Sequence, residues 1–235
     1  GLAGADETDL GVRIWDWKAA RDENGIRLRA RSGEMDLDLT LIPEKAPVLH
    51  GKKGLSLKGT GPGQSSYYYS MTDLKTEGTV RLPGKEEEKV RGHSWFDHEF
   101  GSNQLGEEQV GWDWFGLHLS DDTELMIYLL RRKDGSIEPV SSGTRVSRSG
   151  TPTHLDLADF AVETTETWKS PDSGGLYPSG WRIRVPRADL DISVTPLVSG
   201  QELLTEATAG ITYWEGAVAV RGRSGGKRIT GGGYV

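Results

Sequence analysis

One segment of the chain occurs twice, and the two copies align without a gap. Residues 25–40 read GIRLRARSGEMDLDLT, and residues 180–195 read GWRIRVPRADLDISVT. In each copy apolar residues alternate first with arginines and then with acidic residues, and this period of two is that of a β-strand. Each copy therefore predicts a β-hairpin with one apolar face. On its other face an arginine row lies opposite an acidic row, which cross-strand pairing favours, although a solvated sheet face explains these charges as well as a binding surface does.

A second, shorter repeat follows in the same order. Residues 77–84 (EGTVRLPG) resemble residues 215–222 (EGAVAVRG). Repeats in the same order indicate two homologous β units, which we place at residues 1–88 and 89–235, with the charged run KEEEK at 85–89 as a solvated linker. The first unit has far fewer residues ahead of its hairpin than the second. We therefore expect the first unit to be incomplete, through truncation or through loss of strands.

Turn residues and short apolar runs are spread over the whole chain. The 235 residues include 32 glycines and 10 prolines, and no long stretch has a helical period. In the second unit we expect strands at 112–119, 124–132, 137–146, 155–168, 181–186, 189–195 and 211–221. The run at 125–130 is apolar throughout, which predicts burial on both faces. Consecutive strands joined by short turns predict an all-β, antiparallel fold that closes into a barrel, and a barrel of about eight strands can hold one small ligand.

Charge and composition exclude several classes of protein. The net charge is −7 and no cluster of Lys and Arg accompanies an aromatic platform, so we expect no nucleic-acid partner. The chain has no cysteine, hence no disulfide or thiolate chemistry, and no apolar run approaches the roughly 20 residues that span a bilayer. No spacing fits a zinc site, a calcium loop or a phosphate-binding loop, so we expect no metal and no cofactor. Nothing in the sequence specifies an oligomeric state.

The densest group of chemically active side chains lies between residues 92 and 115. This segment holds three of the eight tryptophans and two of the five histidines. If residues 93–100 form an extended strand, alternate residues share a face. One face then carries His93, Trp95, Asp97 and Glu99, and the other carries Phe96, His98 and Phe100. A carboxyl beside an indole in a dry pocket has a raised pKa and can act as a general acid, and the π face of tryptophan stabilises a cation.

Two sets of candidate residues follow from this segment and from the tyrosine run at 67–69. The candidate catalytic residues are Asp97, Glu99, His93 and Asp113. The candidate ligand-binding residues are Trp95, Trp112, Trp114, His98, Tyr67 and Tyr69. Each set has a structural alternative: tryptophans fill the ends of a barrel, Asp97 accepts backbone hydrogen bonds at a turn, and the tyrosines pack within the sheet. Bulges at Gly92, Gly101 and Gly111 would also change the assignment of faces.

Several segments together resemble the AttH/CrtC family of lipocalin-like proteins. They are residues 92–115, LMIY at 125–128, Tyr177-Pro178, Trp181 and YWEG at 213–216. The family includes carotenoid 1,2-hydratases (hydroxyneurosporene synthases) and, more distantly, fungal Diels–Alder cyclases. The resemblance implies two tandem lipocalin-like (calycin-type) antiparallel β-barrels, the first of them incomplete, in agreement with the repeat. A Trp-rich motif near the N-terminus of the family and its closing segment after GYV are absent from this sequence.

The resemblance implies an apolar, isoprenoid-like small molecule as the partner. In a hydratase reaction Asp97 is the first candidate for the acid that protonates a C=C bond, with Glu99 and Asp113 behind it. Trp95, Trp112 and Trp114 would stabilise the cation or line the pocket, and His93 or His98 would position water. The alternatives are a non-catalytic lipocalin-like carrier and a scaffold protein of the bacterial cell envelope. Because bacterial members of the family are often exported, we expect the periplasm or the cell envelope as the location.

Overall fold

A computed structural model describes residues 2–101, 106–205 and 212–235, and almost all of its regular structure is antiparallel β-sheet. The first sheet contains β1 (Ala3–Ala5), β2 (Gly11–Ile14), β3 (Trp17–Asp22), β4 (Gly25–Ser32), β5 (Met35–Pro43), β6 (Val48–Leu49), β7 (Leu55–Leu57), β8 (Ser65–Arg81) and β9 (Glu88–Gly101). The second contains β10 (Gln109–Leu119), β11 (Glu124–Arg132), β12 (Ser142–Val146), β13 (Pro152–Asp156), β14 (Ala161–Lys169), β15 (Leu176–Val185), β16 (Leu190–Pro196), β19 (Ala217–Ser224) and β20 (Lys227–Tyr234). A separate pair is formed by β17 (Glu202–Leu204) and β18 (Thr212–Trp214), and the short 3-10 helices are η1 (Leu157–Asp159) and η2 (Pro186–Ala188).

Both predicted hairpins are present, as β4–β5 and β15–β16. The predicted charge rows also form: Arg31 pairs with Asp36 at 2.6 Å, and Arg182 pairs with Asp191 at 2.7 Å. The registers differ, because a two-residue turn closes the first hairpin and η2 lengthens the turn of the second. A residue of the first hairpin therefore lies opposite a partner two positions further along the chain than the equivalent residue of the second hairpin does. A shift of two leaves every side chain on its face, so both hairpins keep one apolar face.

The second repeat also has a structural counterpart. The end of β8 pairs with β5, where Val80 lies opposite Leu37, and β19 pairs with β16, where Val218 lies opposite Pro196. The order β3-β4-β5-β8 of the first sheet thus corresponds to the order β14-β15-β16-β19 of the second. Sequence repeats that occupy equivalent strands in equivalent order support two related β units.

Contacts divide the chain into two compact units. The smaller unit comprises Gly1–Pro47 and Ser70–Asp97, and the larger unit comprises Val48–Tyr69 and His98–Val235. The long strands β8 and β9 each run from one unit into the other. The predicted domains, 1–88 and 89–235, were drawn from the sequence repeat, whereas these two units are defined by contacts. A domain boundary near residue 88 stays a prediction.

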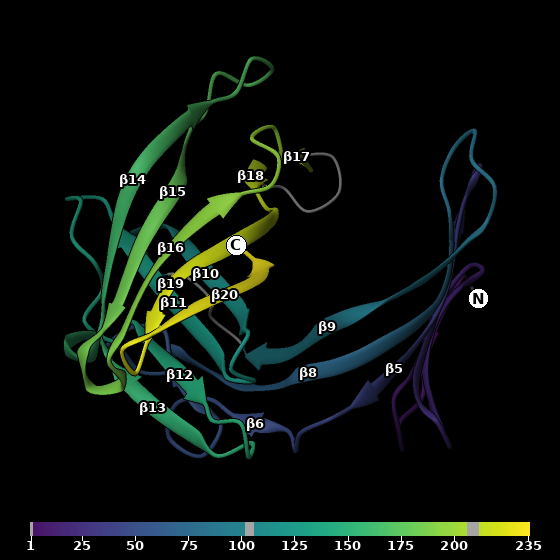
Figure 1. Ribbon diagram of the computed structural model, residues 1–235, viewed down its shortest axis with the longest axis horizontal. Helices are drawn as coiled ribbons and strands as arrows, with labels where there is room; N and C mark the ends of the chain where they lie inside the picture. The colour runs from purple at the N-terminus through teal and green to yellow at the C-terminus, as the bar shows by residue number, and fades with distance from the viewer. Residues whose placement is uncertain (1, 102–105, 206–211) are drawn as a thin grey trace. The chain divides into compact units, whose positions relative to one another are not determined.

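The second sheet, here called the barrel sheet, follows the order β13-β12-β11-β10-β20-β19-β16-β15-β14 and is strongly curved (Figure 1). One of its faces, the inner face, carries the apolar core of the larger unit. The core residues are Phe115, Leu117, Leu119, Leu125, Ile127, Leu129, Leu155, Phe160, Trp181, Ile183, Val185, Leu190, Ile192, Val194, Val218, Val220 and Ile229. The first seven residues of β11 are all buried, as its continuous apolar run predicts.

The smaller unit has a much smaller core. Its buried members are Ile26, Leu41, Met71 and Leu74, and Phe96 of β9 packs against them. Among the residues that the structure describes, no helix has the length and apolarity needed to cross a membrane.

Some strand boundaries differ from the predicted ones. The predicted strand at 155–168 is two strands, because η1 interrupts it between β13 and β14, and the Asp156 and Asp159 side chains cap that turn. The predicted strand at 137–146 shortens to β12, with Ile137 in an isolated bridge to Arg131. The predicted strand at 211–221 is β18 and β19 with a break between them, and residue 211 lies outside the described residues.

Candidate functional site

The predicted acid Asp97 and its neighbour Trp95 lie on β9 in the smaller unit. Asp97 is exposed, and its Oδ1 accepts hydrogen bonds from the Ser70 hydroxyl and, at 2.8 Å, from Trp95 Nε1. The bond between residues two positions apart agrees with the predicted shared face. A carboxylate that is exposed and already accepts two hydrogen bonds is stabilised in its charged form, which does not favour proton donation.

His93 lies on the same strand and forms an exposed pair. Its Nδ1 is 2.8 Å from Asp73 Oδ1, and the His93 side chain is 58% exposed. A carboxylate partner orients the imidazole, and that partner is only 15% exposed, so His93 covers Asp73 from the solvent side. The solvent-facing imidazole is thus held by an ion pair and not by a pocket.

Glu99 belongs to the larger unit, where it pairs with a buried lysine. Glu99 Oε1 lies 2.5 Å from Lys58 Nζ and accepts a hydrogen bond of 2.5 Å from Ser66. Lys58 is only 8% exposed, and its ammonium stands 4.3 Å from the centroid of the Tyr128 ring and 5.4 Å from that of Tyr68. The pair is a satisfied ionic group with cation–π support. Sequence reasoning missed Lys58, because nothing in its surroundings in the chain signals burial.

Further buried polar groups lie between β6–β8 and the outer face of the barrel sheet. His50 Nδ1 is 2.9 Å from Thr144 Oγ1, and burial, assisted by the positive charges of Lys58 and His154, lowers the pKa of His50 to about 3. Trp114 Nε1 donates to the Tyr68 hydroxyl at 2.9 Å. These bonds tie two layers of the larger unit together, so this polar layer is structural.

The remaining predicted ligand-binding residues on β8 and β9 form an exposed aromatic group in the larger unit. Tyr67 stacks on Phe100 with 5.6 Å between ring centroids, and Tyr69 meets His98 edge-on at 5.2 Å. His98 also lies 5.1 Å from Phe100, so these two residues share a face as predicted. Tyr67 and Phe100 are 58% and 50% exposed. The group is therefore an exposed surface cluster that a ligand can reach.

Asp113 differs from the other candidate acids. On β10 it alternates with Phe115 and Leu117 of the core, so its carboxyl is on the inner face of the barrel sheet. Its side chain is 18% exposed, and its charged neighbour is Arg131, with 3.5 Å between Asp113 Oδ2 and Arg131 Nε. Burial raises the pKa of Asp113 above its ordinary value of 3.8, and the charge of Arg131 opposes this rise.

The pair of Asp113 and Arg131 leaves hydrogen-bonding capacity unused. No hydrogen bond joins the Asp113 carboxyl to another described residue, and Arg131 Nε is buried without a hydrogen-bond partner in the same part of the chain. Buried polar groups in proteins are nearly always satisfied, so the unsatisfied Arg131 Nε beside a largely buried acid marks this pair as a candidate for function. Arg131 alternates with Leu129 along β11, and this alternation in the sequence could have placed Arg131 on the apolar face.

Aromatic rings of the core continue from Asp113 across the inner face. Phe115 meets Trp181 edge-on with 5.5 Å between centroids, and Trp181 lies 6.0 Å from Trp214. The predicted Trp112 and Trp114 lie instead on the outer face, where Trp112 is 45% exposed and the Trp114 ring covers Gly116. The rings nearest in sequence to Asp113 are therefore not those that share its face.

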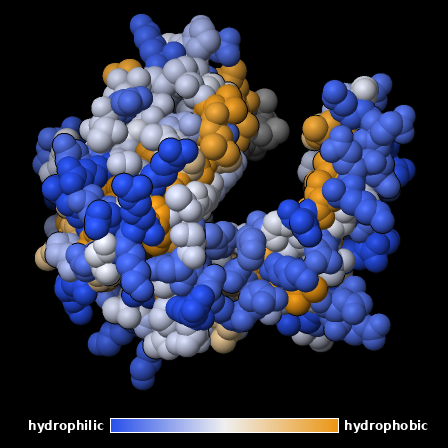
Figure 2. Space-filling view, in the orientation of Figure 1, coloured by the Kyte–Doolittle hydropathy of each residue, from blue (hydrophilic) through white to orange (hydrophobic). Residues whose placement is uncertain are grey.

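Asp113 lies at the end of the barrel sheet that also carries an apolar rim. At this end of the sheet Gly116 pairs with Tyr234 and Pro196 pairs with Val218. Beyond these pairs, β10 extends to Asp113, and the chain that follows β16 extends in the same direction to Leu197. The rim consists of Leu197, Val198, Leu203 and Leu204, which are 39–65% exposed. Figure 2 shows hydrophobic surface gathered beside β17 and β18. An apolar rim at the same end of the sheet as a largely buried acid suits a molecule that is mostly hydrocarbon.

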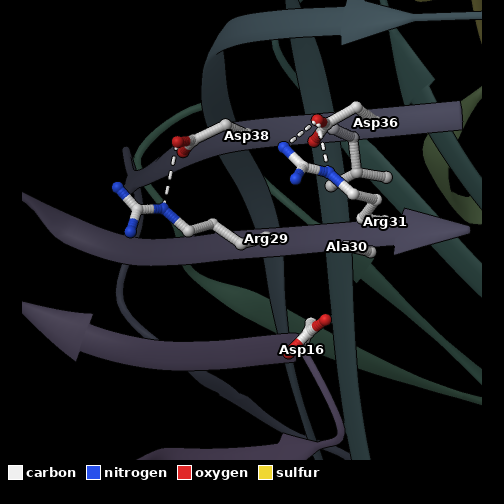
Figure 3. Close-up of a pocket in the computed structure, with 7 residues that line it drawn as sticks. Asp16, Arg29, Ala30, Arg31, Asp36 and Asp38 are labelled. Carbon is white, nitrogen blue, oxygen red and sulfur yellow. Dashed lines mark hydrogen bonds and ion pairs between the residues drawn. The ribbon is translucent and has the colours of Figure 1, made fainter.

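A polar depression of about 300 Å³ lies on the smaller unit, lined by Asp16, Arg29, Ala30, Arg31, Asp36, Leu37 and Asp38. Figure 3 shows that its arginines already hold carboxylates, Arg29 with Asp38 and Arg31 with Asp36. These charges are the predicted hairpin rows. Since they neutralise one another in solvent, the depression is a solvated sheet face.

In residues 2–101, 106–205 and 212–235, no three His, Asp or Glu side chains gather as ligands for a metal ion. Glu99 and Asp113 both belong to the larger unit, but Glu99 contacts Lys58 and Asp113 contacts Arg131, so the two acids share no partner. The arrangement that can do chemistry is the Asp113–Arg131 pair with the aromatic rings of the inner face.

Comparisons with known proteins agree with this fold. The family model described as AttH-like matches residues 1–235. The crystal structure of a candidate AttH protein from Nitrosomonas europaea is 31% identical, with a TM-score of 0.87 over 98% of this chain and 70% of that chain. Kievitone hydratase from Nectria haematococca is 20% identical, with a TM-score of 0.77 over 97% of this chain and 69% of that chain, which shows a shared fold. No curated protein matches the sequence. The chain belongs to the AttH-like family and has its lipocalin-like β fold.

Proposed function

We propose that the protein binds an apolar, isoprenoid-like molecule at the Asp113 end of the barrel sheet and adds water across one of its C=C bonds. The observation that carries the proposal is the Asp113 carboxyl. It lies on the apolar inner face, is largely buried, and has no hydrogen bond from any described residue. Asp97, the first candidate from the sequence, is exposed and accepts two hydrogen bonds, so Asp113 replaces it as the proposed acid.

The proposed reaction begins with proton transfer from the Asp113 carboxylic acid to one carbon of the double bond. Burial raises the pKa of Asp113, which increases the protonated fraction at a given pH. The other carbon becomes a tertiary cation, and the π face of Trp214, which is only partly buried where it packs against the core, stabilises its charge. A water molecule adds to the cation through an oxygen lone pair, and the proton it loses returns to the Asp113 carboxylate. The acid is regenerated, and no co-reactant other than water is consumed.

A second candidate function is a non-catalytic carrier or scaffold. The observation that favours it is Arg131, whose positive charge 3.5 Å from Asp113 stabilises the carboxylate rather than the acid. In a carrier the same apolar face and rim hold the ligand unchanged. For either function we propose the periplasm or the cell envelope as the location, on the strength of the resemblance to exported bacterial proteins; fractionation of the host cells is the test.

Turnover of an acyclic carotenoid, measured as the mass gain of one water, tests the reaction. Asp113→Asn is expected to remove turnover while ligand binding, followed by tryptophan fluorescence, persists, because the amide keeps the shape and loses the acidic proton. Asp97→Asn is the matched control and is expected to retain turnover. Unchanged turnover in Asp113→Asn would refute Asp113 as the acid. Binding without turnover by the unmodified protein would establish the carrier.

A further inference from the structure

One layer of the larger unit, formed by β7 and the first part of β8, has two unlike faces. Ser56 and Tyr68 point toward the barrel sheet and form hydrogen bonds with its side chains. Successive side chains of a strand point to opposite faces, so Leu55, Leu57 and Tyr67 point away from the barrel sheet. Leu55 and Tyr67 lie directly opposite each other in the pairing of the two strands, so they are neighbours on this second face.

Further apolar side chains adjoin this pair. Phe100 of β9 stacks on Tyr67 with 5.6 Å between ring centroids, and Leu49 Cδ2 lies 3.7 Å from the place that a Cβ on Gly54 would take. Together these residues form a surface that we call the docking face. Its members are 38–58% exposed, and they are Leu49, Leu55, Leu57, Tyr67 and Phe100. Single exposed apolar residues are common, whereas adjoining ones mark a surface that another molecule covers.

Two lysines lie at the edge of the docking face, in the turn between β6 and β7. Lys52 and Leu55 exchange both backbone hydrogen bonds, at 2.9 and 3.2 Å, so they lie opposite each other and share a face. Lys53 follows in the left-handed conformation of the same turn, with φ at 55°. Both lysines are exposed, and among the described residues neither has a carboxylate within ion-pair distance.

The charge of this edge is therefore unlike that of the rest of the larger unit. Several other exposed cations of the unit have acidic partners: Lys133 with Glu108, Arg148 with Asp122, Arg182 with Asp191, and Arg187 with Asp159. The whole chain has a net charge of −7, yet two unopposed positive charges border the docking face. An apolar surface with positive charges at its edge is complementary to an apolar layer that lies beneath negative charges.

We propose that the docking face binds the surface of a bilayer that contains anionic lipid. The leucines and Phe100 enter the boundary between head groups and acyl chains, Tyr67 keeps its hydroxyl at the level of the head groups, and the lysines meet lipid phosphates. A protein partner fits this composition less well, because the centres of protein interfaces are depleted in lysine and leucine seldom dominates their binding energy. The inference goes beyond the proposed function and does not depend on it.

Sedimentation with two kinds of vesicle tests the inference. One kind contains phosphatidylcholine alone, and the other contains equal parts of phosphatidylcholine and the anionic phosphatidylglycerol. The unmodified protein is expected to bind the anionic vesicles at least tenfold more tightly, which is about 1.4 kcal/mol. Added salt is expected to weaken this preference, because salt screens exposed charges.

Substitution of two leucines tests the apolar part of the docking face. Leu55→Gln combined with Leu57→Gln is expected to weaken binding to the anionic vesicles at least tenfold, because amide side chains do not enter the apolar layer. The matched control is Leu82→Gln combined with Leu176→Gln, at two exposed leucines outside the docking face, and it is expected to bind as the unmodified protein does.

Substitution of the two lysines tests the charged part. Lys52→Gln combined with Lys53→Gln is expected to remove the preference for anionic vesicles and its dependence on salt. The matched control, Lys85→Gln combined with Lys89→Gln, changes the net charge equally at two other exposed positions and is expected to keep the preference.

A fluorescent label shows which surface meets the bilayer. The chain has no cysteine of its own, so Leu57→Cys and Leu176→Cys each provide a single site for an environment-sensitive fluorophore. Anionic vesicles are expected to shift the emission of the label at residue 57 to shorter wavelength and to leave the emission of the label at residue 176 unchanged.

Absence of vesicle binding by the unmodified protein would overturn the inference, as would binding that survives Leu55→Gln combined with Leu57→Gln. A dimer of the unmodified protein that these two substitutions dissociate would overturn it as well, because a second copy would then cover the docking face. None of these measurements depends on turnover or on Asp113, so each of these results leaves the proposed function standing.

Discussion

His50 makes a sharp prediction about stability in mild acid. The residue follows β6, is 1% exposed, contacts Thr144 Oγ1 through Nδ1 at 2.9 Å, and lies 4.3 Å from the Tyr68 ring. Burial, with the positive charges of Lys58 and His154, lowers its pKa from 6.5 to about 3. Between these pH values His50 is neutral in the folded protein and protonated in the unfolded chain.

The magnitude follows from this difference. The stability due to neutral His50 is fully present above pH 6.5, declines as the pH falls, and is lost entirely only near pH 3. The difference between 6.5 and about 3 corresponds to about 5 kcal/mol at most. Between pH 7 and pH 5, where ordinary carboxylates stay ionised, the expected loss in the free energy of unfolding is about 2 kcal/mol.

The assay is urea unfolding, followed by tryptophan fluorescence at pH 7 and pH 5. The unmodified protein is expected to lose about 2 kcal/mol more than His50→Gln between these two pH values, because glutamine does not titrate. The raised pKa of Asp113 acts in the opposite direction, since that group stabilises the fold as the pH falls, but it is present in both proteins and cancels in the comparison. His93→Gln, at a 58% exposed position, is the control and is expected to behave as the unmodified protein does.

The same pH dependence in His50→Gln and in the unmodified protein would refute this reasoning. It would mean that His50 is protonated inside the folded protein. Burial would then not disfavour the charged imidazole, and this result would contradict the contacts described above.

Two further pairs of substitutions test the core and the buried ion pair of the larger unit. Phe115→Ala, at a fully buried position, is expected to lower the free energy of unfolding by about 3–5 kcal/mol, whereas Val110→Ala, at a 60% exposed position, should change it by less than about 0.5 kcal/mol; equal effects in urea unfolding would contradict the inner-face core. Glu99→Ala is expected to lower the free energy of unfolding by about 3 kcal/mol. This value is near the lower end for a buried ion pair, because a third of the Glu99 side chain is exposed. The double variant with Lys58→Met should recover part of that loss. Additive effects in this double-mutant cycle would show that the Lys58–Glu99 pair has no coupling.

The sequence by itself determined the local β architecture. Alternation with a period of two is a property of neighbouring residues, so both hairpins, their charge rows and the continuous burial of β11 could be predicted from it. The repeat predicted two homologous β units, and the repeated segments occupy equivalent strands in the two sheets. Even the register difference left these predictions intact, because a shift of two residues preserves every face.

Only the tertiary structure decided which charged groups are buried and what they meet. Asp97 and Asp113 look alike in the sequence, each within two residues of a tryptophan, yet Asp97 is exposed and Asp113 lies on the apolar inner face. Lys58 meets Glu99 across 41 positions of the chain, and Asp113 of β10 meets Arg131 of β11. Burial and partners arise from contacts between distant strands, and local periodicity carries no information about which strands meet. For this reason the sequence predicted the faces of the strands but not the acid that this fold places against its core.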